Sequence, residues 1–131
     1  MPVYDGELFR PPAPLARVDL RNPTTGAAVR NVPMLLDTGA DVTLVPESSL
    51  TSLGLSLQSA PSYELVGFDG MHSSARAVDL QLVLLERSFA GRFLTIDQSW
   101  GILGRNVLNS LPLLLNGPEG TWGLARLSGK P

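Results

Sequence analysis

The sequence predicts a small, closed all-β barrel built as a single domain. The chain has 131 residues with 44% hydrophobic content, which is enough for one domain with its own core. Its 13 glycines and 11 prolines separate short apolar runs, and no long stretch has helical periodicity. We therefore expect residues 1–131 to fold as many short strands joined by turns, which close into a barrel.

The first half of the chain predicts an extended segment, two strands and a helical turn. Residues 1–14 include three prolines within four positions, so this segment should lie extended along the surface. Residues 15–21 alternate between apolar and polar side chains, as a half-buried strand does. The turn at residues 22–26 leads into a returning strand over residues 28–36. A short helical turn is expected within residues 46–54.

The second half predicts two hairpins, a continuation of the sheet and one short helix. A glycine-containing tip at residues 67–71 suggests a hairpin that can bend. The short C-terminal helix is expected over residues 105–111, because Pro112 cannot continue it. Strands are expected at residues 63–66, 75–80, 80–85, 89–96, 113–115 and 121–124.

Composition argues against several classes of function. The net charge of −2 is spread along the chain, which argues against a nucleic-acid or anionic-membrane surface. With no cysteine and only His72 as a histidine, neither a metal site nor thiol chemistry is expected, and no cofactor is implied. A histidine at this position is more often a surface residue than a functional one. No apolar run is long enough to cross a bilayer and no signal pattern is present, so we expect a cytoplasmic protein.

The most informative stretch is residues 35–46, where apolar residues lead directly into Asp37, Thr38 and Gly39. An acid at the end of an apolar strand is costly to bury unless neighbouring groups compensate it. Thr38 offers a hydroxyl, and Gly39 offers a backbone that can bend tightly. The pattern suits a carboxylate that handles a proton in a shielded site. The same tripeptide is also ordinary turn chemistry, so a simple Asx-turn is the competing interpretation.

Two separated blocks resemble the retropepsin-like aspartic proteases, which include the retroviral proteases and cellular and bacterial relatives. The first block runs from Leu36 to Leu44 and is similar to the active-site loop of that family. The second runs from Gly101 to Leu108 and is similar to its apolar-apolar-Gly-Arg-Asn/Asp segment. The resemblance covers residues 29–115 and implies the acid-protease type of β-barrel. An unrelated barrel with a fortuitous turn is the remaining alternative.

The resemblance implies specific roles for residues of both blocks. Asp37 would be the catalytic residue, and Asp41 would form a structural ion pair with Arg105 beneath the active site. Thr38 would hold the loops of two subunits together, and Gly39 would bring its carbonyl close to the substrate. The predicted active-site loop support therefore consists of Thr38, Gly39 and Ala40.

The resemblance also implies a flap, a hairpin that closes over bound peptide. The alternatives are a plain surface hairpin for the flap and plain core positions for the pocket candidates Leu44, Trp100 and Ile102. For Asp41 and Arg105 the alternative is a solvated surface charge. The substrate-binding and flap candidates are Leu44, Gly67, Phe68, Asp69, Gly70, Trp100 and Ile102.

Two departures from the retroviral pattern stand out. Apolar Val42 follows Asp41, which disfavours polar recognition at that edge of the pocket. The chain also continues for about twenty residues past the expected helix. Residues 113–124 either build the dimer sheet, as the termini do in retroviral proteases, or lie elsewhere.

Carboxylate-based peptide hydrolysis needs two carboxylates in one site, and the chain has a single Asp-Thr-Gly. A two-fold homodimer would supply the second Asp37. We therefore expect a homodimeric aspartic endopeptidase that acts on extended peptides, with no cofactor and no nucleic-acid or membrane partner. The alternative is a catalytically silent retropepsin-fold module for dimerisation or peptide binding.

Overall fold

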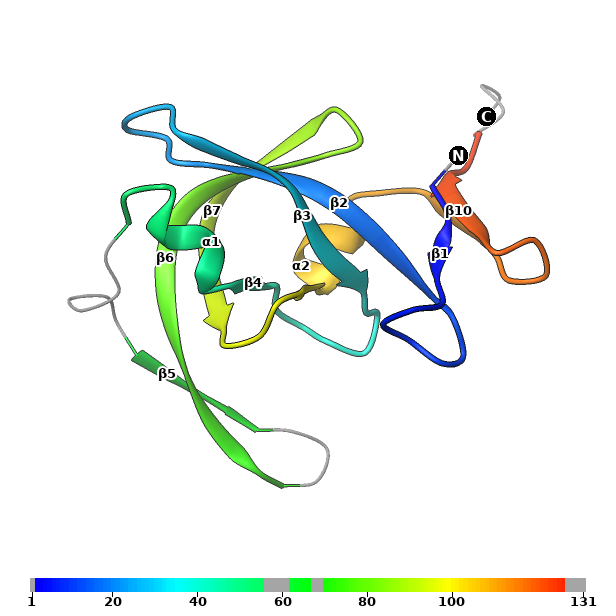
Figure 1. The fold of residues 1–131 in the computed structure, drawn as a ribbon, viewed down its shortest axis with the longest axis horizontal. Coiled ribbons are helices and arrows are strands. Elements are labelled where there is room, and N and C mark those ends of the chain that lie inside the picture. Colours follow the sequence, from blue (N-terminus) through cyan, green and yellow to red (C-terminus); the bar gives the residue numbers. More distant parts are fainter. Residues whose placement is uncertain (1, 56–61, 67–69, 127–131) are drawn as a thin grey trace.

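Six strands close into a ring in the computed structural model, which describes residues 2–55, 62–66 and 70–126. The strands are β2 (Ala13–Arg21), β3 (Ala28–Leu36), β4 (Leu44–Pro46), β6 (His72–Leu84), β7 (Arg87–Ile96) and β8 (Gly101–Leu103). Their order around the ring is β2–β3–β8–β4–β7–β6, and β6 pairs back with β2 through Leu20 and Leu82. The predicted closed β-barrel is therefore confirmed (Figure 1).

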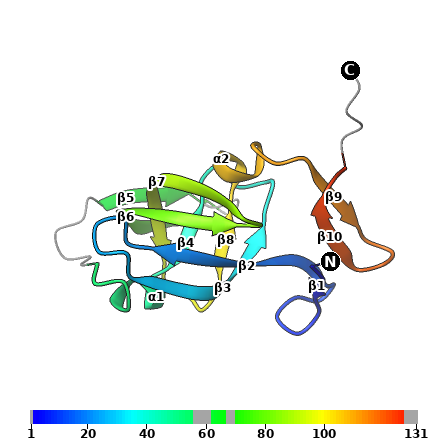
Figure 2. The ribbon, with the colours of Figure 1, turned by 90° about the horizontal axis from the view of Figure 1, so that it is seen from above.

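The remaining elements extend or flank this ring. Strand β1 (Tyr4–Asp5) pairs with β2, and β5 (Ser62–Val66) pairs with β6. Strands β9 (Leu113–Asn116) and β10 (Thr121–Leu124) form a separate hairpin that stands outside the barrel (Figures 1 and 2). Helices α1 (Ser48–Thr51) and α2 (Arg105–Leu108) have four residues each. Within the described residues, no helix is long and apolar enough to cross a membrane.

The core lies inside the ring and follows from strand alternation. In β2, Ala16, Val18 and Leu20 are buried, whereas Arg17 is exposed. Residues of the facing strands, such as Leu82, fill the same interior. Each buried aliphatic side chain contributes about 1.5–3 kcal/mol relative to its exposed state, so this alternating pattern stabilises the closed ring.

Two short strands, β4 and β8, lie between β3 and β7 in the ring. Strand β8 runs parallel to β3, with Leu36 beside Leu103, and antiparallel to β4, with Leu44 beside Ile102. The end of β3 and the start of β4 therefore both lie against β8. This arrangement holds the two ends of the intervening loop, residues 37–43.

Most predicted elements are present, and the differences concern the length of some elements and three short strands that were not predicted. Residues 75–85 were expected as two strands but belong largely to the single strand β6. The helix expected over residues 105–111 ends at Leu108, and a turn closed by a hydrogen bond from the Leu111 N–H to the Leu108 carbonyl continues the chain. Strands β1, β4 and β8 were not predicted, because two or three residues are too few to show alternation.

Candidate active site

Asp37 begins the loop between β3 and β4, and backbone hydrogen bonds fix its position. Its N–H donates to the Leu103 carbonyl at 3.0 Å, and its own carbonyl accepts from the Ala40 N–H at 3.1 Å. The Asp37 Oδ1 atom accepts from the Gly39 N–H at 3.0 Å. The Asx-turn weighed as the competing interpretation is therefore present. It holds the half-buried carboxylate in one orientation and leaves its Oδ2 atom for other partners.

Residues of the second block hold this loop in place through hydrogen bonds. The backbone N–H of Arg105 donates to the Ala40 carbonyl at 2.8 Å, and its guanidinium Nη1 donates to the Thr38 carbonyl at 2.7 Å. Together with the bond from Asp37 to Leu103, these contacts join the two sequence blocks directly. The blocks are far apart in the chain but form one structural unit.

Thr43 and Asn106 also join the two blocks through hydrogen bonds, and neither was predicted as a site residue. The Thr43 side chain is buried, with 1% of its surface exposed. Its Oγ1 accepts from the Gly104 N–H at 3.0 Å and donates to Asn106 Oδ1 at 2.7 Å. A polar residue between apolar Val42 and Leu44 was the available signal, since a buried hydroxyl needs a specific partner.

Gly104 is the point at which the two blocks approach most closely. A Cβ atom at this position would lie 2.2 Å from the Val42 carbonyl oxygen and 2.5 Å from the Val42 carbonyl carbon. Both are backbone atoms, so only a shift of the main chain could make room. Glycine is therefore required here by the close approach of two segments.

We predict that Gly104→Ala destabilises the fold by about 3 kcal/mol, because overpacking against backbone cannot be relieved by side-chain rotation. Urea denaturation checks this value. Gly91→Ala is the matched control, since a Cβ there meets nothing within 4 Å, and we expect it to change stability by less than about 0.5 kcal/mol. Equal denaturation midpoints for the two variants would contradict the prediction.

The predicted Asp41–Arg105 ion pair is absent from the structure. Both side chains are described and both residues are exposed, and their charged atoms form no ion pair. The guanidinium turns instead to the Thr38 carbonyl. The expectation of a buried pair was wrong because Arg105 lies at the solvent-facing start of α2. In the single chain Arg105 contacts the loop of residues 37–43 through this bond and through its backbone N–H.

We predict that Arg105→Ala lowers stability by about 1 kcal/mol, the usual effect of losing one hydrogen bond at an exposed site. Any activity should fall more steeply, by about 10-fold, because the loop that carries Asp37 loses one of its anchors. Thermal melting and peptide-cleavage rates measure the two effects separately. Unchanged values of both would show that the contact with Thr38 has no function.

A cavity of about 1000 Å³ lies over the active-site loop. Asp37, Gly39 and Ala40 of the loop line it, together with Leu94 and Ile96 of β7. The hairpin of β5 and β6 contributes residues 64–66 and Ser74 to the lining. The cavity combines apolar walls with charged groups, which are Asp37, Asp41, Glu64, Asp97 and Arg105.

The predicted pocket residues divide into two groups. Leu44 lines this cavity, whereas Trp100 and Ile102 do not. Trp100 packs edge-on against Phe9 of the N-terminal segment, with 4.9 Å between the ring centroids. Ile102 is half-buried in β8. Sequence alone could not show that residues before β2 fold back over Trp100.

The predicted flap hairpin is formed by β5 and β6, with Val66 paired to His72. Gly70 is exposed and has φ of +79°, a conformation that suits glycine. The other predicted tip residues, Gly67, Phe68 and Asp69, lie outside the described residues.

Comparison with protein families gives a match over most of the chain. The family model described as retroviral aspartyl protease matches residues 12–116. This range includes both sequence blocks, the whole barrel and β9. The chain has no significant match among curated proteins.

Proposed function

The chain belongs to the retroviral aspartyl protease family, and we propose that it is an aspartic endopeptidase that works as a homodimer. In this proposal a water molecule attacks the peptide bond between two Asp37 carboxylates, one from each subunit. Membership of a fold family does not by itself establish an activity. The proposal therefore depends on the residues that this chain has at the site.

Asp37 supports the proposal most directly. Its carboxylate lines the large cavity and is oriented by a hydrogen bond from the Gly39 N–H. A carboxylate held at the base of a cavity with apolar walls is suited to act as a general base. Surface aspartates such as Asp79, which pairs with Arg92 in solvent, have no comparable setting.

A second subunit is required by the chemistry. One aspartate must be ionised to accept a proton from water while the other is protonated, and a single chain supplies only one Asp-Thr-Gly sequence. Thr38 is exposed beside Asp37, and its hydroxyl makes no hydrogen bond within the part of the chain that the structure describes. We propose that this hydroxyl bonds to the loop of the partner.

The proposed reaction conserves protons at every step. The ionised Asp37 takes a proton from water as the water oxygen bonds to the carbonyl carbon. The protonated Asp37 of the partner gives its proton to the carbonyl oxygen, and a gem-diol forms. In the second step the nitrogen receives a proton from the first aspartate and the C–N bond breaks. The second aspartate takes back a hydroxyl proton, so the pair returns to one proton.

The peptide would bind extended between the loop and the β5–β6 hairpin. We propose that this hairpin is the flap and that Leu44, with Leu94 and Ile96, contacts a substrate side chain. Gly39 would place its carbonyl against the peptide backbone. Trp100 and Ile102 are not retained as pocket residues of the single chain.

Digestion of a proteome-derived peptide library at several pH values tests the proposal. Cleavage products with a shared sequence preference at the cut are the expected result. An intact library at every pH, with a protein shown to be folded and dimeric, would favour the silent peptide-binding module instead.

A further inference from the structure

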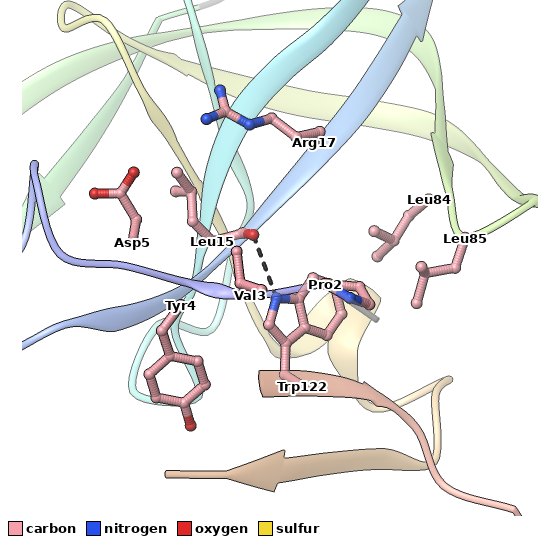
Figure 3. Close-up of a pocket in the computed structure, with 9 residues that line it drawn as sticks. All are labelled: Pro2, Val3, Tyr4, Asp5, Leu15, Arg17, Leu84, Leu85 and Trp122. Carbon is pink, nitrogen blue, oxygen red and sulfur yellow. Dashed lines mark hydrogen bonds between the residues drawn. The ribbon is translucent and has the colours of Figure 1, made fainter. Parts of the chain in front are cut away.

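A second cavity, of about 370 Å³, lies between the barrel and the elements that flank it (Figure 3). Strand β10, the N-terminal segment, β2 and the end of β6 all contribute to it. The lining residues are Pro2, Val3, Tyr4, Asp5, Leu15, Arg17, Leu84, Leu85 and Trp122. None of them lines the cavity over Asp37. Small-molecule sites in proteins have volumes of about 300–1,000 Å³, so this cavity is large enough to hold a small ligand.

The buried part of the lining is apolar. Leu15, Leu84 and Trp122 are 5%, 1% and 1% exposed. Leu15 points away from the barrel core, because its β2 neighbour Ala16 points into it, and Leu15 is buried by the flanking elements instead. The Trp122 Nε1 donates to the Leu15 carbonyl at 3.3 Å (Figure 3). Because the indole nitrogen is already bonded, this part of the cavity offers apolar surface to a ligand.

The charged part of the lining consists of one cation, Arg17, and one anion, Asp5. Neither side chain forms an ion pair within the part of the chain that the structure describes. The Asp5 Oδ1 atom accepts from the N–H groups of Glu7 and Leu8 at 2.9 Å and 2.7 Å. These two bonds fix the orientation of the carboxylate. Among the described residues its Oδ2 atom accepts no hydrogen bond, and it can therefore accept one from a ligand.

The charged and apolar parts of this cavity are separated. In Figure 3 the Asp5 carboxylate and the Arg17 guanidinium lie to the left, whereas Leu84 and Leu85 lie to the right. A guanidinium binds a carboxylate through two parallel hydrogen bonds, and a carboxylate oxygen accepts readily from an ammonium group. A complementary ligand therefore carries both charges at one end and an apolar group at the other.

We propose that this cavity binds a free α-amino acid with an apolar side chain, such as leucine. Its carboxylate accepts from the Arg17 guanidinium, its ammonium group donates to Asp5 Oδ2, and its side chain contacts the apolar lining. A fatty acid would bring a second negative charge beside Asp5, and an amine would bring a second positive charge beside Arg17, whereas an amino acid compensates both. The proposed activity does not depend on this site, because no residue of the cavity over Asp37 takes part.

Titration of the protein with L-leucine, followed by proton–nitrogen correlation NMR, tests the proposal. The Trp122 indole N–H reports on the cavity and should shift saturably, with half-saturation in the low millimolar range. The indole signal of Trp100, which lies outside the cavity, should stay in place. L-Leucinamide lacks the carboxylate and isocaproate lacks the ammonium group, so each should bind about tenfold more weakly or worse. Binding of either compound as tightly as L-leucine would overturn the need for both charges.

Two substitutions assign each charge of the ligand to its partner. Arg17→Gln should weaken binding of L-leucine about tenfold or more without weakening that of L-leucinamide. Asp5→Asn should do the same for L-leucine without weakening that of isocaproate, and its amide oxygen can still accept the bonds that Oδ1 accepts. Arg21→Gln, at the exposed end of β2, is the control and should leave the affinity unchanged. An unshifted Trp122 signal in the wild type, or unchanged affinity in both cavity variants, would overturn the proposal.

Discussion

Asp37→Asn should lower kcat/KM for peptide cleavage by roughly 10⁴-fold or more while leaving the fold intact. An amide cannot accept a proton from water, so both subunits of the variant lose their base. The Asn side chain keeps an Oδ1 atom that can accept the 3.0 Å bond from the Gly39 N–H, and the loop should therefore retain its shape. Peptide cleavage and thermal melting measure activity and stability on the same preparations.

Asp79→Asn is the matched control for this substitution. The Asp79 side chain is 67% exposed and pairs with Arg92 on the outer surface of the β6–β7 hairpin, so its loss should change neither quantity appreciably. Cleavage by Asp37→Asn at a rate close to that of the wild type would show that another group activates the water. A large fall in melting temperature would show instead that the Asp37 carboxylate is a structural residue.

The sequence predicted the barrel because its longer strands carry their own signal. Residues 16–21 alternate between apolar and polar side chains, and β2 buries the apolar members of that run. The two blocks around Asp37 and Arg105 also predicted that distant segments meet, and hydrogen bonds join them in the structure. The sequence therefore predicted the strands that show alternation and the contact between the two sequence blocks.

Side-chain partners were less predictable, because they depend on orientation. The distance in sequence between Asp41 and Arg105 is compatible with an ion pair, but the guanidinium reaches the Thr38 carbonyl instead. Trp100 precedes the second block as a pocket residue would, yet Phe9 packs against it. The buried hydroxyl of Thr43 was missed because its partner, Asn106, lies 63 residues away. Such contacts form only when the barrel closes and brings segments that are distant in the sequence together.

The second large effect concerns the assembly. If each active site needs two copies of Asp37, specific activity should fall on dilution below the dimer dissociation constant, because monomers have no complete site. The rate should then approach a square dependence on protein concentration. A carrier protein in every dilution controls for adsorption to surfaces. Activity per subunit that stays constant from well above to well below the measured dissociation constant would contradict the dimeric site.

Inactive subunits should also poison active ones. Wild-type protein is mixed with a nine-fold excess of Asp37→Asn and left to exchange, after which random pairing leaves about a tenth of the wild-type subunits with a wild-type partner. Activity per wild-type subunit should then fall about tenfold, because a heterodimer has only one ionisable Asp37 and cannot hold both roles. The same excess of Asp79→Asn should raise the total activity about tenfold, since that variant supplies intact sites of its own and the activity per intact subunit stays unchanged. An enzyme complete within one chain would keep its full activity per wild-type subunit in the Asp37→Asn mixture, so the loss in that mixture measures directly whether the partner contributes its aspartate.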